Sequence, residues 1–424
     1  MRRLLLAALG LVGLLALAPT VQGHPRDPEI RFATFNASLN RSASGQLVDH
    51  LSHPEVNDVY RRQIRNVAEV IQRNRPDVLL INEFDFDPPA VDLFRENFLE
   101  VSQNGARPIH YPYAFIAPSN TGIPSGMDFD NSGTVGGPGD AFGFGFFPGQ
   151  FGMVVYSKYP IDVGDVRTFQ LFRWEDMPGA LLPDDPRTPE PADWYSPEEL
   201  DIFRLSSKSH WDIPIDVGDH DIHFLVSHPT PPVFDDPPQF PPGVDFNGRR
   251  NHDEIRLWAD YISGGRRARY IYDDEGHTGG LGRGEQFVIA GDQNSDPVDG
   301  DSIPGSAQQL LEHPRVNASK TPRSRGAVEA ARLQGGANDD HRGHPRFDTA
   351  DFNDNPAPGN LRADYVLPSR SLGIEDSAVF WPLQRDPLFR LTGVFDAAEW
   401  GPVGGFPTSD HRMVWVDVKA DDDD

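Results

Sequence analysis

Short apolar segments recur along the chain, each rich in β-branched and aromatic residues and bounded by turn-forming residues. This pattern is typical of strands that are buried in a sheet. It predicts seven strands, at residues 30–36, 78–82, 151–157, 222–227, 287–290, 364–367 and 413–418.

Longer segments between these strands have the periodicity of amphipathic helices. In residues 57–74 one face collects Val59, Ile64, Val67, Val70 and Ile71. A second helix is predicted at residues 251–263 and a short one near 307–311. Strands interleaved with helices favour a layered α/β arrangement over repeats or an all-β sandwich.

The first 23 residues have the pattern of a secretory signal peptide. Basic residues follow Met1, an apolar run covers residues 4–18, and the segment closes at Gly23. A run of about 15 residues is too short to cross a bilayer comfortably, and no later segment is apolar enough. We therefore expect a secreted protein, extracellular or periplasmic, with its domain over residues 24–420 and a solvated acidic tail at 421–424.

Composition narrows the architecture and the chemistry. Glycine and proline supply 40 residues each of the 424, more than in average proteins, so strands and loops should outweigh helices. The chain has no cysteine, which excludes disulfides, cysteine-based zinc sites and thiol nucleophiles. A formal net charge of −26 argues against a passive nucleic-acid-binding module, which would carry a basic surface.

Three segments have the character of insertions, at residues 119–150, 173–198 and 334–360. Long loops in an ordered domain often bind ligands or cover sites. We expect residues 173–198 to be a mobile surface addition. For the aromatic stretch 142–151 three interpretations stay open, namely stacking on a base, insertion into lipid and covering of the core.

Polar residues stand at the ends of the predicted strands. They are Asn36, Glu83, His228, Asp292, Asn294, Asp364, Asp410 and His411. Each taken singly has an ordinary explanation, such as a turn former or a solvated strand end. Together they predict one shared rim that carries oxygen ligands and imidazoles.

The order of these residues resembles the endonuclease/exonuclease/phosphatase superfamily, which includes deoxyribonuclease I, exonuclease III, inositol polyphosphate 5-phosphatases and bacterial sphingomyelinases. The resemblance spans about residues 29–418. Its motifs are Phe35-Asn36, Asn82-Glu83, Ser227-His228-Pro229, Gly291-Asp292-Gln293-Asn294, Arg362-Ala363-Asp364-Tyr365 and Ser409-Asp410-His411. It implies an α+β fold, a four-layer α/β/β/α sandwich with the active site at one edge of the packed sheets.

The resemblance further implies hydrolysis of a phosphate ester by water, assisted by Mg²⁺ or by Mn²⁺ or Ca²⁺. Glu83 would be the principal metal ligand, with Asn36 and Asp410 as partial or water-mediated ligands. This set suits a hard cation, because Mg²⁺ prefers carboxylate and amide oxygens and retains several waters. The cation would offset the anionic charge that makes a phosphodiester repel nucleophiles.

Catalytic roles are carried over in the same way. Asp292 and Asn294 would position the attacking water and the phosphate, and Asp292 is the candidate base. His411 would stabilise or protonate the phosphate oxygens, with its ring held by Asp364. His228 matches the second histidine of the deoxyribonuclease I branch, where exonuclease III-like members have tyrosine.

The substrate stays open at this level. A phosphodiesterase or nuclease leads, which makes nucleic acid one candidate partner. The alternatives are a phosphomonoesterase acting on nucleotide, sugar or inositol phosphates, and a lipid phosphodiesterase of sphingomyelinase type. A non-catalytic binding protein on the same scaffold ranks lower, since every key residue is present. We expect a monomer.

Weaker candidates lie outside the six motifs. Arg250 could bind substrate phosphate, or it could belong to a helix start capped by Asn251 with Glu254 three residues on. Two groups are fainter metal candidates: Asp128, Asp130 and Asn131 for Ca²⁺, and His341 and His344 among Asp339, Asp340 and Asp348 for a second metal.

Overall fold

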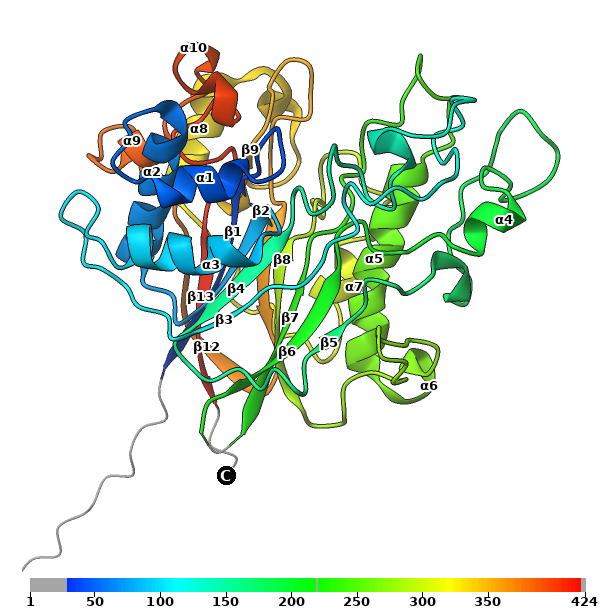
Figure 1. Cartoon of the computed structure of the whole chain (residues 1–424), viewed down its shortest axis with the longest axis horizontal. Helices are drawn as coiled ribbons and strands as arrows, with labels where there is room; N and C mark the ends of the chain where they lie inside the picture. Colours follow the sequence, from blue (N-terminus) through cyan, green and yellow to red (C-terminus); the bar gives the residue numbers. More distant parts are fainter. Residues whose placement is uncertain (1–28, 219, 421–424) are drawn as a thin grey trace, which may run out of the picture.

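The computed structural model describes residues 29–218 and 220–420, so the expected signal peptide and acidic tail lie outside the described residues. Two β-sheets pack face to face, and helices cover the outer face of each sheet (Figure 1). The predicted α+β fold with α/β/β/α layers is confirmed. Within the described part of the chain, no helix is long and apolar enough to cross a membrane.

The first sheet has the strand order β12-β13-β1-β2-β4-β3. Its strands are β1 (Ile30–Leu39), β2 (Val78–Phe84), β3 (Tyr113–Phe115), β4 (Met153–Ser157), β12 (Leu372–Val379) and β13 (Val414–Ala420). The two central strands, β1 and β2, run parallel with Asn36 opposite Asn82, so their carboxyl ends meet at one edge.

The second sheet has the order β11-β8-β7-β6-β5. Its strands are β5 (Arg167–Thr168), β6 (His210–Asp216), β7 (Asp221–Ser227), β8 (Gln286–Asp292) and β11 (Asp364–Pro368). Strands β7 and β8 are parallel, which again brings two carboxyl ends together. A separate two-stranded ribbon pairs β9 (Ala350–Asp351) with β10 (Asn360–Leu361).

Helices lie outside both sheets. They are α1 (Gln46–Ser52), α2 (Val59–Asn74), α3 (Pro88–Phe94), α4 (Pro197–Leu200), α5 (Phe246–Ser263), α6 (Gly265–Ala268), α7 (Gln308–Leu311), α8 (Arg325–Gln334), α9 (Phe389–Thr392) and α10 (Ala397–Trp400). Helices α1–α3 lie on the first sheet, and α5 runs along the second (Figure 1).

Alternation along β1 explains the layering. Ala33 and Phe35 point to the helical side, where they pack with Ile64 and other residues of α2. Phe32 points the other way, into the apolar layer between the sheets, with its ring centroid 5.4 Å from that of Phe224. Because successive side chains of a strand face opposite sides, one apolar strand fills two cores.

The predicted helices are present with different starts. Helix α2 begins after Asp58, whose carboxylate accepts a hydrogen bond from the Arg61 amide. Helix α5 begins at Phe246, five residues earlier than predicted. The expected Asn251 cap is therefore wrong, because Asn251 lies within α5 and not at its start. Its side-chain amide donates hydrogen bonds to the carbonyls of Thr230 and Gln293.

The segment 173–198 was expected to be a surface addition, and that is wrong for its two ends, whereas residues 186–192 are exposed. Trp174, Met177, Trp194 and Tyr195 are buried in the core between the second sheet and α5. The Trp174 indole donates a 2.7 Å hydrogen bond to Asp253 of α5. The aromatic side chains supply the burial that the proline-rich, acidic composition concealed.

The loop 119–150 divides its aromatic residues between core and surface. Phe142 is buried against Phe129, so it covers the core as one of the three interpretations expected. Phe144 and Phe146 are 58 % and 68 % exposed and contact each other edge to face. Gly122 allows the loop to close, since a Cβ atom there would lie 1.9 Å from the Phe147 carbonyl oxygen.

The segment 334–360 supports the last motif of the chain. It carries short 3₁₀ turns and the β9–β10 ribbon. The Asp351 amide donates to the Asp410 carbonyl, and the Arg412 amide donates to the Thr349 carbonyl. These bonds hold the Ser-Asp-His segment on both sides of His411.

Two long strands escaped prediction, β6 and β12. Strand β6 alternates Trp211, Ile213 and Ile215 with polar residues, but Pro214 interrupts the pattern, and a proline argues against a central strand. Asp212 is nevertheless buried, because it accepts hydrogen bonds from His223 and Tyr261. Its polarity is satisfied by partners that are distant in sequence.

Candidate active site

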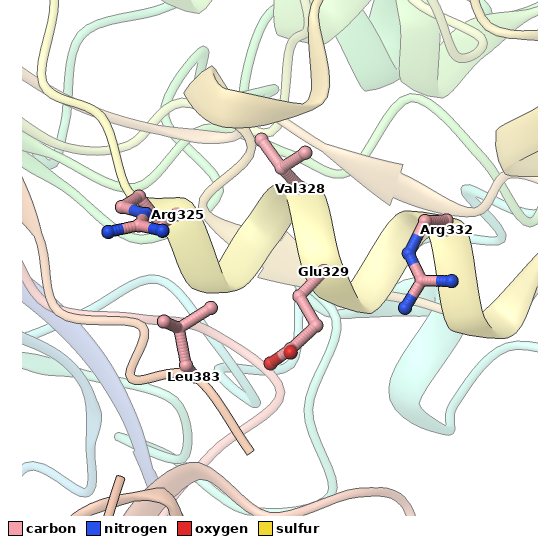
Figure 2. Close-up of a pocket in the computed structure, with 5 residues that line it drawn as sticks. All are labelled: Arg325, Val328, Glu329, Arg332 and Leu383. Carbon is pink, nitrogen blue, oxygen red and sulfur yellow. The ribbon is translucent and has the colours of Figure 1, made fainter. Parts of the chain in front are cut away.

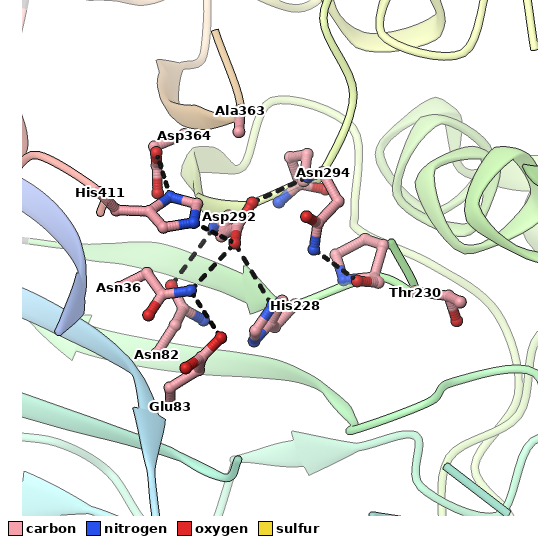
Figure 3. A network of polar contacts seen from close by, with 12 residues as sticks. Asn36, Asn82, Glu83, His228, Thr230, Asp292, Asn294, Ala363, Asp364 and His411 are labelled. Atoms are coloured by element: carbon pink, nitrogen blue, oxygen red, sulfur yellow. Dashed lines mark hydrogen bonds and ion pairs between the residues drawn. The ribbon is translucent and has the colours of Figure 1, made fainter. Parts of the chain in front are cut away.

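The residues expected at strand ends meet between the two sheets (Figure 3). Asn36 lies on β1 and Glu83 on β2, while Asp292 ends β8 and pairs across the second sheet with Asp364 at the start of β11. The Asn36 side-chain amide donates to Glu83 Oε1 at 3.0 Å and to Asp292 Oδ2 at 3.1 Å. This amide therefore joins the two sheets.

Glu83 and Asp410 form an acidic half of the site. Glu83 has a positive φ of 58°, which is uncommon for a residue with a side chain and is often found at functional sites. Burial and the nearby negative charge of Asp410 raise the pKa of Glu83 to about 7. A buried carboxylate with a second negative charge nearby favours a bound cation.

This donor set fits a divalent metal ion. Two carboxylates and the amide oxygen of Asn36 are hard oxygen ligands, and the repulsion between Glu83 and Asp410 is what a cation would relieve. Glu83, Asn36 and Asp410 are thus the residues that would hold it. A bound cation would supply charge stabilisation to a phosphate oxygen and to an attacking or leaving oxygen.

His411 lies between two carboxylates. Its Nδ1 donates to Asp364 Oδ2 at 2.9 Å, and its Nε2 lies 3.6 Å from Asp292 Oδ2. Burial opposes the imidazolium charge, but the carboxylates of Asp364 and Asp292 outweigh it and raise the pKa of His411 well above its usual range. The ring is therefore charged near neutral pH, with an N–H directed at Asp292.

Asp292 is the carboxylate of the site with the most polar partners. Its Oδ2 lies 3.4 Å from His228 Nε2, and its Oδ1 accepts a 2.9 Å bond from the Asn294 amide. Although burial favours the neutral form, His411, His228 and Asn36 hold the pKa of Asp292 well below its usual range. The group is ionised over the whole physiological range.

Atoms of Asp292, Asp364 and His411 lie within 4.8 Å of one another, a spacing that a metal ion could also use. The hydrogen bond from His411 Nδ1 to Asp364 and the approach of Nε2 to Asp292 already occupy both ring nitrogens. The imidazolium offsets one of the two carboxylate charges and leaves no free ring nitrogen for a metal ion, so the candidate cation site is the one at Glu83 and Asp410.

His228 differs from His411 in its charge. Burial and the positive charge of Lys208 lower the pKa of His228 to about 4. Its Nδ1 is buried without a hydrogen-bond partner. The ring is therefore neutral, with Nε2 as the protonated nitrogen that faces Asp292 and Nδ1 as the bare one.

Asn294 and Asp364 are positioned by neighbouring backbone. Asn294 has a positive φ of 50°, and its side-chain amide donates to the Pro229 carbonyl at 3.0 Å. Asp364 accepts a 2.8 Å bond from the Thr349 hydroxyl, which in turn accepts bonds from the Ala363 and Asp364 amides. Thr349, which no sequence motif indicated, fixes the carboxylate that holds His411.

This geometry can be compared with known proteins. The model of the endonuclease/exonuclease/phosphatase family matches residues 33–411, nearly all of the described chain. The chain belongs to this family. Its members are metal-dependent hydrolases of phosphate esters, so the family and the enzyme class expected from the motifs are confirmed.

Solved structures of similar fold include three bacterial proteins. An endonuclease/exonuclease/phosphatase from Beutenbergia cavernae DSM 12333 is 16% identical, covering 92% of this chain and 72% of its own, with a TM-score of 0.47. A mannosyl-6-phosphatase from Bacteroides thetaiotaomicron VPI-5482 is 11% identical, covering 92% and 99%, with a TM-score of 0.41. Sphingomyelinase C from Streptomyces griseocarneus is 14% identical, covering 92% and 99%, with a TM-score of 0.39. No curated protein matches the chain in sequence.

Within this phosphoesterase site, Lys208 is a residue that the sequence analysis missed. Its side chain is buried, and burial lowers the pKa of its amine. The carboxylates of Glu254, Glu83 and Asp292 are the negative charges that oppose this shift. Lys208 is one of only four lysines in the chain, and a lone lysine next to an apolar strand was the available signal.

Arg250 is not a substrate-binding residue, and that expectation is corrected. Its side chain is buried and donates to the carbonyls of Leu205, Phe142 and Arg204. The guanidinium lies 4.8 Å from the Phe203 ring. Arg250 ties the loop 119–150 to the segment before β6.

The fainter metal candidates change composition in the structure. Asp128 and Asp130 lie close to Asp140 in place of Asn131, whose amide donates to the Trp194 carbonyl. All three carboxylates bind backbone or hydroxyl donors within the loop. His341 binds the Pro358 carbonyl and His344 accepts from the Arg346 amide, so these two histidines do not converge on a metal.

A surface pocket of about 290 Å³ lies along α8, away from these residues (Figure 2). It is lined by Arg325, Val328, Glu329, Arg332 and Leu383. One carboxylate between two guanidinium groups lacks both the histidine and the ligand set that phosphoester hydrolysis needs. The candidate hydrolytic site is therefore the rim shown in Figure 3.

Proposed function

We propose that the protein is a secreted, monomeric phosphodiesterase that uses one Mg²⁺ or a similar cation. The observation that carries this proposal is the charged His411, held by Asp364 and facing Asp292, beside the acidic pair of Glu83 and Asp410. These two halves supply a proton donor and a cation site on either side of one phosphate group.

In this proposal His411 acts on the phosphate and its leaving oxygen. A charged imidazole can hold an anionic phosphate oxygen, and it can donate its Nε2 proton as the ester bond breaks. The hydrogen bond from Nδ1 to Asp364 keeps the ring in that orientation. Asp364 therefore acts through His411 and does not contact the substrate.

Asp292, Asn294 and His228 act on the side of the attacking water. Asp292 accepts a hydrogen bond from water and orients it, and it takes the proton as the oxygen bonds to phosphorus. The low pKa of Asp292 makes it a weak base, so its orienting role is the larger one. The neutral His228 contributes an N–H without adding charge.

Asn36, Glu83 and Asp410 hold the cation in this proposal. The carboxylates of the site outnumber its cationic groups, so one divalent ion leaves little net positive charge. A phosphodiester carries one negative charge and a phosphomonoester close to two, so the diester meets less repulsion. This charge balance favours a diesterase over a monoesterase.

The test compares bis(p-nitrophenyl) phosphate with p-nitrophenyl phosphate, with Mg²⁺, Mn²⁺ or Ca²⁺ and with a chelator. We expect the diester to be hydrolysed faster and chelation to abolish turnover. Plasmid DNA, RNA and sphingomyelin then separate the diester classes. A protein that prefers the monoester under every metal, or that keeps full activity in chelator, contradicts the proposal.

A further inference from the structure

Two polar residues of α5 are buried beside the loop that follows His228. Asn251 and Glu254 are both 0 % exposed. They stand three residues apart in α5, so they share one face of the helix. Because burial of a carboxylate costs free energy unless hydrogen bonds compensate it, the donors that bind Glu254 indicate what this helix face holds.

Both backbone groups of Thr230 bind this pair. The Thr230 amide donates to Glu254 Oε2 at 2.6 Å, and the Thr230 carbonyl accepts from the Asn251 side-chain amide at 2.8 Å. Residues 229–232 are otherwise prolines, which have no N–H, so Thr230 supplies their only backbone donor. The loop that follows His228 is therefore fixed to α5 at this residue (Figure 3).

The same two side chains bind two further segments. Glu254 Oε1 accepts a 2.7 Å hydrogen bond from the Ser207 amide, in the segment before β6. The Asn251 side-chain amide also donates to the Gln293 carbonyl at 2.9 Å, in the segment after β8. One face of α5 thus holds together three loops at the same edge of the second sheet.

One peptide unit connects Glu254 with Asn294. This unit joins Pro229 to Thr230: its N–H donates to Glu254, and its carbonyl accepts a 3.0 Å hydrogen bond from the Asn294 side chain. Because a peptide unit is planar and rigid, Glu254 fixes the direction of the carbonyl that Asn294 binds.

A second peptide unit connects Asn251 with Asp292. This unit joins Gln293 to Asn294: its carbonyl accepts from Asn251, and its N–H donates to Asp292 Oδ1 at 2.9 Å. Asn251 therefore fixes the orientation of a donor that holds the Asp292 carboxylate.

We infer that Asn251 and Glu254 are positioning residues for the side of the active site that orients the attacking water. The inference rests on the proposed function, which assigns this side to Asp292, Asn294 and His228. Neither residue of α5 contacts the substrate, and each acts through a peptide unit. A misplacement of about 1 Å can lower a rate by about 100-fold, so loss of the pair should act on kcat more than on KM.

Asp253 offers a matched control on the same helix. It is also 0 % exposed, and its Oδ2 accepts hydrogen bonds from the Trp174 indole at 2.7 Å and from the Leu181 amide at 2.6 Å. These donors belong to the segment 173–198, which carries no residue of the site. Asp253→Asn and Glu254→Gln each replace a buried carboxylate that accepts two N–H bonds, so they separate loss of a buried charge from loss of position.

The experiment measures kcat, KM, the apparent Mg²⁺ affinity and Tm for each variant. The substrate is whichever of bis(p-nitrophenyl) phosphate and p-nitrophenyl phosphate the unmodified protein hydrolyses faster, so a preference for the monoester counts against the proposed function alone. We expect Glu254→Gln to lower kcat by about 10-fold or more, with KM and Mg²⁺ affinity nearly unchanged. Asp253→Asn should lower Tm by a similar amount and leave kcat unchanged.

A double-mutant cycle with Asn294→Ala tests the route through the peptide unit. In the Asn294→Ala background, Glu254→Gln should lower kcat by a much smaller factor than in the unmodified protein. Two outcomes would overturn the inference: Glu254→Gln lowers kcat no more than Asp253→Asn does, or the two losses in the cycle multiply in full. Circular dichroism checks folding, and Asn251→Ala replaces Glu254→Gln in the comparison with Asp253→Asn if that variant does not fold.

Discussion

The two halves of the active site balance their charges in different ways. In one half, the His411 imidazolium lies between Asp364 and Asp292, so both of its ring nitrogens already have carboxylate partners within the protein. In the other half, burial and the negative charge of Asp410 raise the pKa of Glu83 to about 7. The first half is complete without a ligand, and the second is not.

The difference between the halves predicts which part of the site depends on a bound metal ion and which part does not. The histidine half should keep its geometry through metal removal, since its hydrogen bonds do not involve the cation site. The acidic half should change protonation with pH and with metal, because a proton and a cation compete for the same oxygens. Variants in the two halves should therefore give different kinetic signatures.

The largest effect is expected from His411→Ala. Loss of the proton donor should lower kcat by about 10²–10⁴-fold, the usual contribution of general acid–base catalysis. The metal affinity should stay within a few fold, since His411 is not in the ligand set. Stopped assays of diester hydrolysis and metal titrations measure both values. His341→Ala is the control, and a His411→Ala enzyme with normal kcat would show that the histidine half is not catalytic.

A change in the acidic half should act first on the metal. Glu83→Gln should weaken the apparent affinity for Mg²⁺ by at least about 10-fold, as losses around metal ligands do, and excess Mg²⁺ should recover part of the activity. Metal-dependence curves of kcat/KM measure this. Glu96→Gln, on the helical surface, serves as control. Unchanged metal dependence in Glu83→Gln would remove Glu83 from the ligand set.

Lys208→Met removes a positive charge that acts on both Glu83 and His228, and its expected effect is smaller. Without the amine, the pKa of His228 should rise, because the positive charge of Lys208 is one cause of its depression. We expect kcat/KM to fall by about 10-fold, a little over 1 kcal/mol, and the acidic limb of the pH profile to move to higher pH. Lys158→Met, which removes a surface pair with Asp77, should change neither. If the acidic limb of the Lys208→Met profile stayed at the same pH as that of the unmodified enzyme, Lys208 would not affect the pKa of His228.

The smallest effect concerns stability against pH. Glu83 has an ordinary pKa of 4.5 and a folded pKa of about 7, so between these values the folded chain binds more protons than the unfolded chain. Metal-free protein should therefore lose stability as pH rises from about 4.5 through about 7, and Mg²⁺ should restore it. Urea unfolding at pH 5 and pH 8 measures the difference. Glu83→Gln should reduce this dependence, and an identical slope in that variant would contradict the shift.

The motifs that are visible in the sequence share a physical property. Glu83, Asp292 and His411 each follow or precede an apolar strand, so the strand pattern is enough to locate them. The same pattern locates the four strands that form the two parallel pairs, whereas the pairing itself is seen only in the structure. The layered fold and the convergence of the site were predictable for this reason.

The errors arose where burial depends on partners far away in the sequence. Arg250 has the appearance of a phosphate ligand beside a helix start, but three distant carbonyls bind it. Trp174 lies in a proline-rich, acidic segment, and its indole is held by a hydrogen bond to Asp253 of α5, which is distant in the sequence. Lys208 and Thr349 stand outside every motif. Local patterns report on neighbours along the chain, and these four residues act through neighbours in space.

The β9–β10 ribbon has one more consequence. Ala350 forms a β-bridge to His411, and the Asp351 amide donates a hydrogen bond to the Asp410 carbonyl. The ribbon therefore fixes two consecutive residues that have different proposed roles. One of them belongs to the proposed ion-binding half and the other to the proton-donating half. Asp410 and His411 are consecutive residues. A shift of the ribbon would therefore change the position of the Asp410 carboxylate and the orientation of the His411 ring together.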